Sequence, residues 1–384
     1  MIVVPHHAPP SHRWLAHLVR ASEALNPCRE RVHDAPLFDP VAVFALARQE
    51  RVAPLLHLGR VDDRIPDPLP DSFRAACEAA YYRTLHKNIV ALKTGRRILD
   101  AFRYAGISAA PLDGWAVLQG PLGYHADPGT RPLEDLEFMV RESDKERAES
   151  VLAELGYRRI SRRDAALRSG HELAFHHNEA GADLFVELHW GWQGSASPAN
   201  RFAVSGDEFL DDLCDITVSG YHRPTRFANL TVAAVRAARH TFGRWIWLVD
   251  LHRIITAVPM DWGPVVSAAR QWRVRAPLYA SLVATRELLH TPIPREVLGR
   301  LAPGPVRRRL LHRSLAACQI AGGASGAARA ARLLLGESWW EVARAAARTA
   351  APGTAANPRR ATAAGTQVRF SHPVRVVSPS AGDR

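Results

Sequence analysis

The chain has 384 residues, of which 47% are hydrophobic, so it is long enough to bury a substantial core and to form two or three domains. Its formal net charge is +12, but all except three of its 50 Lys and Arg residues are arginines, so the charge reflects a composition bias and permits a phosphate-bearing partner without requiring one. The sequence contains no run of about eighteen apolar residues, no signal-peptide pattern and no zinc-type spacing of its four cysteines, so we expect a soluble, cytoplasmic protein without a membrane span or a structural metal.

Residues 1–95 are predicted to form an N-terminal helical region. Asp39 followed by Pro40 favours a helix start, because an Asp side chain caps free backbone N–H groups and Pro is tolerated at the first helical position. A long helix is expected over 71–102, and Gly106 marks its end.

Residues 96–200 show a different pattern, with short alternating segments between glycine turns. The expected strands are 107–112, a short strand within 131–140 that carries the acids, an extended piece at 157–160, and 172–177 and 183–190. The expected helices are 115–118 and 146–155, the second closed by Gly156. The last two strands are separated by a turn at 178–181, so we predict a hairpin beside the strand within 131–140. These residues form the predicted α/β core.

Residues 201–347 return to a helical period and are predicted to form a C-terminal helical domain. Its expected helices are 230–240, 245–257, 263–271, 277–290 and 294–301. Residues 348–384 lack periodic apolar spacing and are predicted to be a flexible tail. The fold class is therefore α+β, with a small mixed or antiparallel sheet flanked by helices.

The strand within 131–140 carries two carboxylates on one face. Read at a period of two, Asp135 and Glu137 lie on one side, about 7 Å apart, and Leu136 and Phe138 lie on the other. Adjacent anions repel each other unless a proton or a metal ion lies between them. This pattern predicts a cation site.

A third acid, Glu187, shares one face of strand 183–190 with His189. Carboxylates on adjacent strands form the oxygen cluster that hard divalent ions such as Mg²⁺ prefer. Two such ions about 4 Å apart can hold both the attacking and the leaving oxygen in phosphoryl transfer. We therefore predict that Asp135, Glu137 and Glu187 form a metal site.

A resemblance rests on these motifs taken in order. The segments 112–114, 131–140 and 186–190 resemble the polymerase-β-like nucleotidyltransferase superfamily, in which a glycine turn precedes an Asp-x-Asp/Glu strand and a third acid follows. The flanks 46–56 and 240–251 are similar to the helices of the bacterial group named "nucleotidyltransferase family protein". The likeness spans roughly residues 40 to 260.

The resemblance implies an enzyme that binds a nucleoside triphosphate through Mg²⁺ or Mn²⁺ and releases pyrophosphate. Asp135 and Glu137 would hold the metal ions, and Glu187 would complete the site and help to take the acceptor proton. Gly114 would let the backbone approach the triphosphate, and Arg131 could reach a phosphate.

Other residues near these motifs have two interpretations each. His189 either faces the substrate or ends the sheet. Arg244 is our candidate for a phosphate contact on the helix that follows His240, whereas Asp250 on the same helix serves either helix packing or a ligand.

Three functions remain open from the sequence. The first is a nucleotidyltransferase that acts on a hydroxyl or phosphate of a small molecule or a peptide. The second is a binding protein on a degenerate fold, because Asp113 stands where the bacterial group often has Lys, and a negative charge opposes triphosphate binding unless a metal or an arginine compensates. The third, less favoured, is a toxin-like enzyme that acts on tRNA. The sequence leaves the base, the acceptor and the oligomeric state open.

Overall fold

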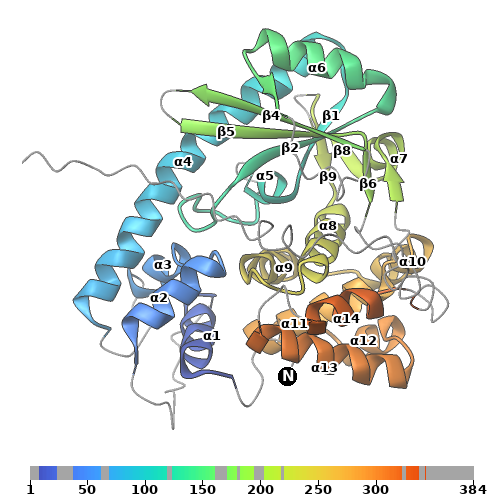
Figure 1. The fold of residues 1–384 in the computed structure, drawn as a ribbon. Coiled ribbons are helices and arrows are strands. Elements are labelled where there is room, and N and C mark those ends of the chain that lie inside the picture. The colour runs from blue at the N-terminus through green and yellow to red at the C-terminus, as the bar shows by residue number, and fades with distance from the viewer. Residues whose placement is uncertain are drawn as a thin grey trace, which may run out of the picture.

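The computed structural model describes residues 8–23, 38–61, 69–118, 123–160, 171–179, 182–193, 203–217, 220–321, 326–336 and 342. Within these residues the protein has fourteen α-helices and a five-stranded mixed sheet with helical segments on both sides, which confirms the predicted α+β class (Figure 1). The predicted tail at 348–384 lies outside the described residues, as does part of the predicted turn at 178–181. No helix in the described part of the chain is long and apolar enough to cross a membrane.

The main sheet has the strand order β1-β2-β5-β4-β3. Its strands are β1 (Ala109–Leu112), β2 (Asp135–Val140), β3 (Arg158–Arg159), β4 (Glu172–Glu179) and β5 (Ala182–His189). β2 and β5 pair in parallel, and the other neighbours pair antiparallel. The predicted hairpin is confirmed as β4 and β5, with β5 beside β2. Two smaller ribbons pair β6 (Gly191–Gln193) with β7 (Ala203–Ser205) and β8 (Cys214–Ile216) with β9 (His222–Pro224).

The apolar face of the sheet follows from the alternation along β2 and β5. Leu136, Phe138, Val186 and Leu188 are all buried in one hydrophobic cluster, which also includes Trp115. Burial of such side chains contributes roughly 1.5–3 kcal/mol each. The opposite face of the same two strands therefore carries the polar side chains.

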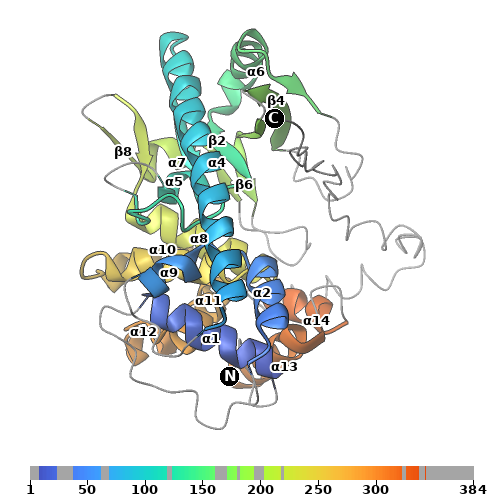
Figure 2. The same cartoon turned by 90° about the vertical axis from the view of Figure 1, so that its left-hand side faces the viewer.

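Four helices precede the sheet: α1 (Pro10–Glu23), α2 (Pro40–Gln49), α3 (Leu55–Val61) and α4 (Asp71–Tyr104). The predicted start of α2 is confirmed, because the Asp39 carboxylate accepts hydrogen bonds from the N–H groups of Val41 and Ala42. The predicted end of α4 is also confirmed, since Gly106 has φ +69°, a conformation that glycine adopts without strain. α4 runs as one rod from the N-terminal helices past the sheet (Figure 2), so it crosses the boundary that the sequence suggested at residue 95.

The remaining helices are α5 (Asp113–Leu118), the short 3₁₀ helix η2 (Glu142–Asp144), α6 (Lys145–Glu154), α7 (Gly206–Asp212), α8 (Arg226–Arg239), α9 (Ile246–Thr256), α10 (Trp262–Gln271), α11 (Arg275–Leu289), α12 (Arg295–Leu301), α13 (Pro305–Ala321) and α14 (Gly326–Leu334). Of these, the early ones include α5 and α6, which pack with α4 in the hydrophobic cluster on the apolar face of the sheet, and the later ones build the C-terminal part. Thr225 is the N-cap of α8, and its hydroxyl accepts a hydrogen bond from the N–H of Ala228. α8 contacts α5, α9 and α11, so its inner face approaches the sheet through α5.

The two helical regions meet at Glu50, the residue after α2. The buried carboxylate of Glu50 accepts a hydrogen bond of 3.1 Å from the N–H of Trp245, and its backbone oxygen accepts one of 3.2 Å from the N–H of Ile246. These N–H groups open α9 and have no partner within that helix. Glu50 therefore fixes the start of α9 against the N-terminal helices.

Candidate active site

Glu137 and Glu187 stand directly opposite each other on the parallel strands β2 and β5. Asp135 lies two residues before Glu137, on the same face of β2, and is paired in register with Phe185. The side chain of Glu137 is 2% exposed and that of Glu187 is 14% exposed. The strand pairing thus brings together the three acids that the sequence selected, with Glu187 the more accessible of the opposed pair.

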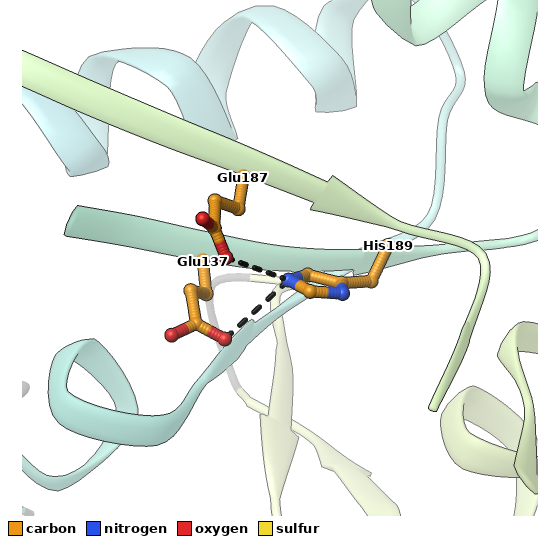
Figure 3. Close-up of side chains that lie close together, drawn as sticks. All are labelled: Glu137, Glu187 and His189. Atoms are coloured by element: carbon orange, nitrogen blue, oxygen red, sulfur yellow. Dashed lines mark ion pairs between the residues drawn. The ribbon is translucent and has the colours of Figure 1, made fainter. Parts of the chain in front are cut away.

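His189 points into the same cluster. Its Nε2 atom lies 3.4 Å from Oε2 of Glu137 and 3.7 Å from Oε2 of Glu187 (Figure 3). The ring is almost completely buried. Burial alone would lower the pKa of His189, but the two glutamates raise that pKa to about 10, so the imidazole is positively charged until an ion displaces its proton.

The donor atoms of Glu137, Glu187 and His189 all lie within 4.8 Å of one another, which is close enough to surround one metal ion. Within the described residues, Oε1 of Glu137 is buried and has no hydrogen-bond partner, whereas Nε2 of His189 lies near the two glutamate carboxylates at distances longer than a good hydrogen bond. Buried polar atoms without partners are rare in folded proteins and call for an explanation such as an ion. The residues present therefore fit a divalent ion.

Asp135 belongs to the same electrostatic cluster. Burial, followed by the nearby charges of Glu137 and Glu187, raises the pKa of Asp135 well above its ordinary value. Two neighbouring acids favour the neutral form of this carboxyl group. A bound cation would lower its pKa again and favour the ionised form. Asp135 is not among the three residues whose donor atoms lie within 4.8 Å of one another, so its place in a metal site stays a prediction.

Arg236 on α8 supplies the internal positive charge of this site. Its Nη2 donates a hydrogen bond of 2.7 Å to Oε2 of Glu137, and its Nη1 lies 3.1 Å from Oδ2 of Asp113. Burial would raise the pKa of Glu137, but Arg236 and then His189 outweigh burial and hold that pKa at about 2. Sequence reasoning missed Arg236, because nothing distinguishes it from the many other arginines of the chain.

Asp113 and Gly114 form the turn between β1 and α5. Asp113 has φ +46°, and burial raises its pKa although Arg236 opposes that shift. A side chain at Gly114 would overlap the guanidinium of Arg131. Glycine is therefore required here for close packing with Arg131, and the approach of its backbone to a triphosphate stays a prediction.

Arg131 is held in a buried ion pair with Asp250 of α9. Its Nε lies 3.1 Å from Oδ1 and its Nη2 lies 2.8 Å from Oδ2 of that carboxylate. His125 adds a third contact, with Nε2 at 2.6 Å from Oδ1 of Asp250. Of the two interpretations of Asp250, this arrangement supports a role in helix packing. The predicted contact between Arg131 and a phosphate would require the guanidinium of Arg131 to leave Asp250.

More accessible cations lie beside Asp135. Arg244 donates a hydrogen bond of 2.7 Å from Nη1 to Oε2 of Glu134, the residue before Asp135, and Arg51 pairs with the other oxygen of Glu134. The guanidinium of Arg244 also lies over the ring of Trp247. Arg244 is thus near the acids, as the sequence predicted, and its phosphate contact stays a prediction.

Two further cations are within electrostatic reach of the acids. Burial lowers the pKa of Lys87 on α4, and Glu134 and Asp135 oppose that shift. Burial and Arg236 lower the pKa of Arg239 on α8, and Glu172, Glu137 and Glu187 oppose it. The sequence did not single out either residue.

A family model described as "Uncharacterised nucleotidyltransferase" matches residues 36–290. The matched region runs from the start of α2 to the end of α11 and includes all the acids and cations described above. No curated protein and no solved structure matches the chain.

Proposed function

Because the chain belongs to the uncharacterised nucleotidyltransferase family, we propose that it is a metal-dependent enzyme that transfers a nucleotidyl group from a nucleoside triphosphate. The acceptor would be a hydroxyl or a phosphate of a small molecule or a peptide, and pyrophosphate would leave. The observation that carries this proposal is the pairing of Glu137 with Glu187 in register on parallel strands, with Asp135 on the same face of β2.

The acids of the cluster would hold Mg²⁺ or Mn²⁺. Such an ion, when bound, neutralises phosphate charge and polarises the phosphoryl group for attack. Glu187, the more exposed of the opposed glutamates, would help to take the proton of the acceptor. Lys87, Arg239 and Arg244 would contact the phosphates, because all three are cations near the acids.

Asp113 motivated the alternative of a binding protein without activity. Its carboxylate lies 3.1 Å from Arg236, so its negative charge is balanced by a neighbouring guanidinium. An acid near the triphosphate is tolerated when an arginine or a metal ion compensates its charge, and Arg236 provides that compensation for Asp113. This pairing favours the enzyme over the binding protein.

The proposal is tested by incubating the purified full chain with each of the four nucleoside triphosphates, labelled at either the α- or the γ-phosphate, in Mg²⁺ or Mn²⁺. Nucleotidyl transfer moves the α-label to an acceptor or to the protein itself and leaves the γ-label in pyrophosphate. Binding of a triphosphate without pyrophosphate release would favour the binding protein. If no triphosphate binds under any condition, the enzyme proposal fails.

A further inference from the structure

We propose that His189 is a direct ligand in a mixed nitrogen and oxygen metal site with Glu137 and Glu187, and that this site prefers Mn²⁺ to Mg²⁺. The inference rests on the proposed function, in that it names the ion of the same site. It departs from the sequence prediction, in which three carboxylates bound Mg²⁺ and His189 either faced the substrate or ended the sheet.

The distances within the cluster suit one ion. Metal–ligand bonds of about 2.1 Å in the octahedral geometry of Mn²⁺ and Mg²⁺ place neighbouring donor atoms roughly 3 Å apart. Nε2 of His189 lies 3.4 Å from the carboxylate of Glu137 and 3.7 Å from that of Glu187, and one donor atom of each residue lies within 4.8 Å of the others. Small rotations of the side chains would therefore bring the ring nitrogen and one oxygen of each glutamate to bonding distance. The strand register fixes these positions, because Glu187 and His189 are two residues apart on β5.

One buried oxygen lacks the partner that an ion would supply. Oε1 of Glu137 makes no hydrogen bond to any described residue, whereas Nε2 of His189 lies close to the carboxylates of Glu137 and Glu187. Glu137 and His189 are both more than nine-tenths buried. Because Arg236 occupies Oε2 of Glu137, Oε1 allows that glutamate to accept an ion while it keeps its arginine.

A carboxylate lies behind the histidine ring. Glu172 on β4 is paired in register with His189, and its Oε2 lies 3.9 Å from Nδ1 of the ring. Histidines that bind metals through one nitrogen commonly donate the other N–H to a carboxylate, which fixes the tautomer and the orientation of the ring. A small movement of Glu172 would form that hydrogen bond and leave Nε2 directed at the ion.

The donor set determines the preferred ion. Mg²⁺ is bound mainly by oxygen and keeps several of its waters, whereas imidazole suits first-row transition ions. Mn²⁺ is a first-row transition ion that binds carboxylates well and accepts an imidazole nitrogen more readily than Mg²⁺ does, so two carboxylates and one imidazole favour Mn²⁺ over Mg²⁺. Replacing the imidazole by an amide should remove that preference.

The test uses the full chain after metal removal with a chelator. Mn²⁺ binding is followed by electron paramagnetic resonance, Mg²⁺ is added as the competitor, and pulsed spectra are recorded on protein with natural or ¹⁵N-labelled histidine. We expect Mn²⁺ to bind at least about tenfold more tightly than Mg²⁺ and to show a nitrogen coupling that changes with the ¹⁵N label.

His189→Asn should abolish the nitrogen coupling and weaken Mn²⁺ binding at least about tenfold, with Mg²⁺ binding changed by less than about threefold. His176→Asn is the matched control, because His176 is a half-buried histidine on the same sheet that pairs with Asp183. It should keep the coupling and the affinity. If His189→Asn does not fold, the isotope effect in the wild-type spectrum decides the question alone.

Absence of Mn²⁺ binding, or binding without a histidine nitrogen coupling, would overturn the inference. The outcomes are separable from those of the proposed function. Pyrophosphate release in Mg²⁺ without a nitrogen coupling in Mn²⁺ would leave the enzyme standing and remove His189 as a ligand. A nitrogen coupling without any nucleotidyl transfer would keep His189 as a metal ligand and remove the proposed enzyme activity.

Discussion

Arg236 and Glu137, which are 99 residues apart in the chain, form an ion pair of 2.7 Å inside the acid cluster. The same guanidinium reaches Asp113, so one arginine of α8 balances acids from two separate segments of the core. The positively charged ring of His189 lies 3.4 Å from the same oxygen of Glu137. These two internal cations explain how several carboxylates can be buried together before any ion binds.

Replacing Arg236 by Met should therefore destabilise the protein by about 2–4 kcal/mol, because it leaves Glu137 and Asp113 without their cation. Added Mn²⁺ should recover part of that loss, since a divalent ion can take over the compensation. Urea denaturation with and without Mn²⁺ measures both effects.

Arg223→Met is the control for this prediction. Arg223 pairs with Asp215 at 3.7 Å at an exposed position, where an ion pair contributes less than about 1 kcal/mol. A similar loss of stability in both variants would show that Arg236 has no special role in balancing the site.

Gly114→Ala should lower stability by a few kcal/mol, since a side chain there overlaps the guanidinium of Arg131 and pushes it from Asp250. The same change in α12, Gly299→Ala, meets no neighbouring atom and should be neutral or stabilise by up to about 1 kcal/mol. Thermal unfolding of the two variants separates these effects. An equal change in unfolding temperature in the two variants would mean that the buried pair of Arg131 and Asp250 does not constrain Gly114.

Glu50 should make stability depend on pH. Burial raises its pKa from 4.5 to about 8, although the N–H of Trp245 and the charge of Arg244 oppose that shift. Between these values the folded protein binds more protons than the unfolded chain, so stability falls as the pH rises from about 4.5 to about 8. Since one pKa unit corresponds to about 1.4 kcal/mol, the loss across this range should reach a few kcal/mol.

Glu50→Gln keeps an acceptor for the N–H of Trp245 but cannot ionise, so its unfolding free energy should vary less with pH over this range. Glu146→Gln changes an exposed glutamate on α6 and should leave the wild-type profile in place. Denaturant unfolding at several pH values gives the slopes. Identical slopes for wild type and Glu50→Gln would rule out the proposed titration of Glu50.

Much of the core could be predicted from local patterns. The alternation of β2 predicted which side chains face the acid cluster and which enter the hydrophobic core, and Gly106 and Gly156 predicted two helix ends. The turn predicted a hairpin beside β2 without indicating that β5, and not β4, would be the neighbouring strand. These features depend on residues close together in sequence, where spacing and turn chemistry decide the structure.

The polar contacts between distant segments could not be predicted. Arg236 reaches Glu137 across 99 residues, and Asp250 reaches Arg131 across 119, so each contact depends on how whole helices pack against the sheet. The place of His189 inside the cluster was missed for a related reason, since alternation gives the face of the strand but does not show how deeply the side chain is buried.

The central claim is that the acid cluster carries out nucleotidyl transfer. The most direct measurement is the rate of pyrophosphate release by the wild type and by the variants Asp135→Asn and Glu187→Gln. Asp183→Asn is the control, because Asp183 is an exposed acid on the same strand as Glu187 and accepts hydrogen bonds from His176 and Asn178. We expect release by the wild type and the control, and a loss of at least about 100-fold in the two site variants, since a lost metal ligand removes several kcal/mol of transition-state stabilisation. Undiminished release by both site variants, or no release by the wild type with any nucleoside triphosphate, would contradict the claim.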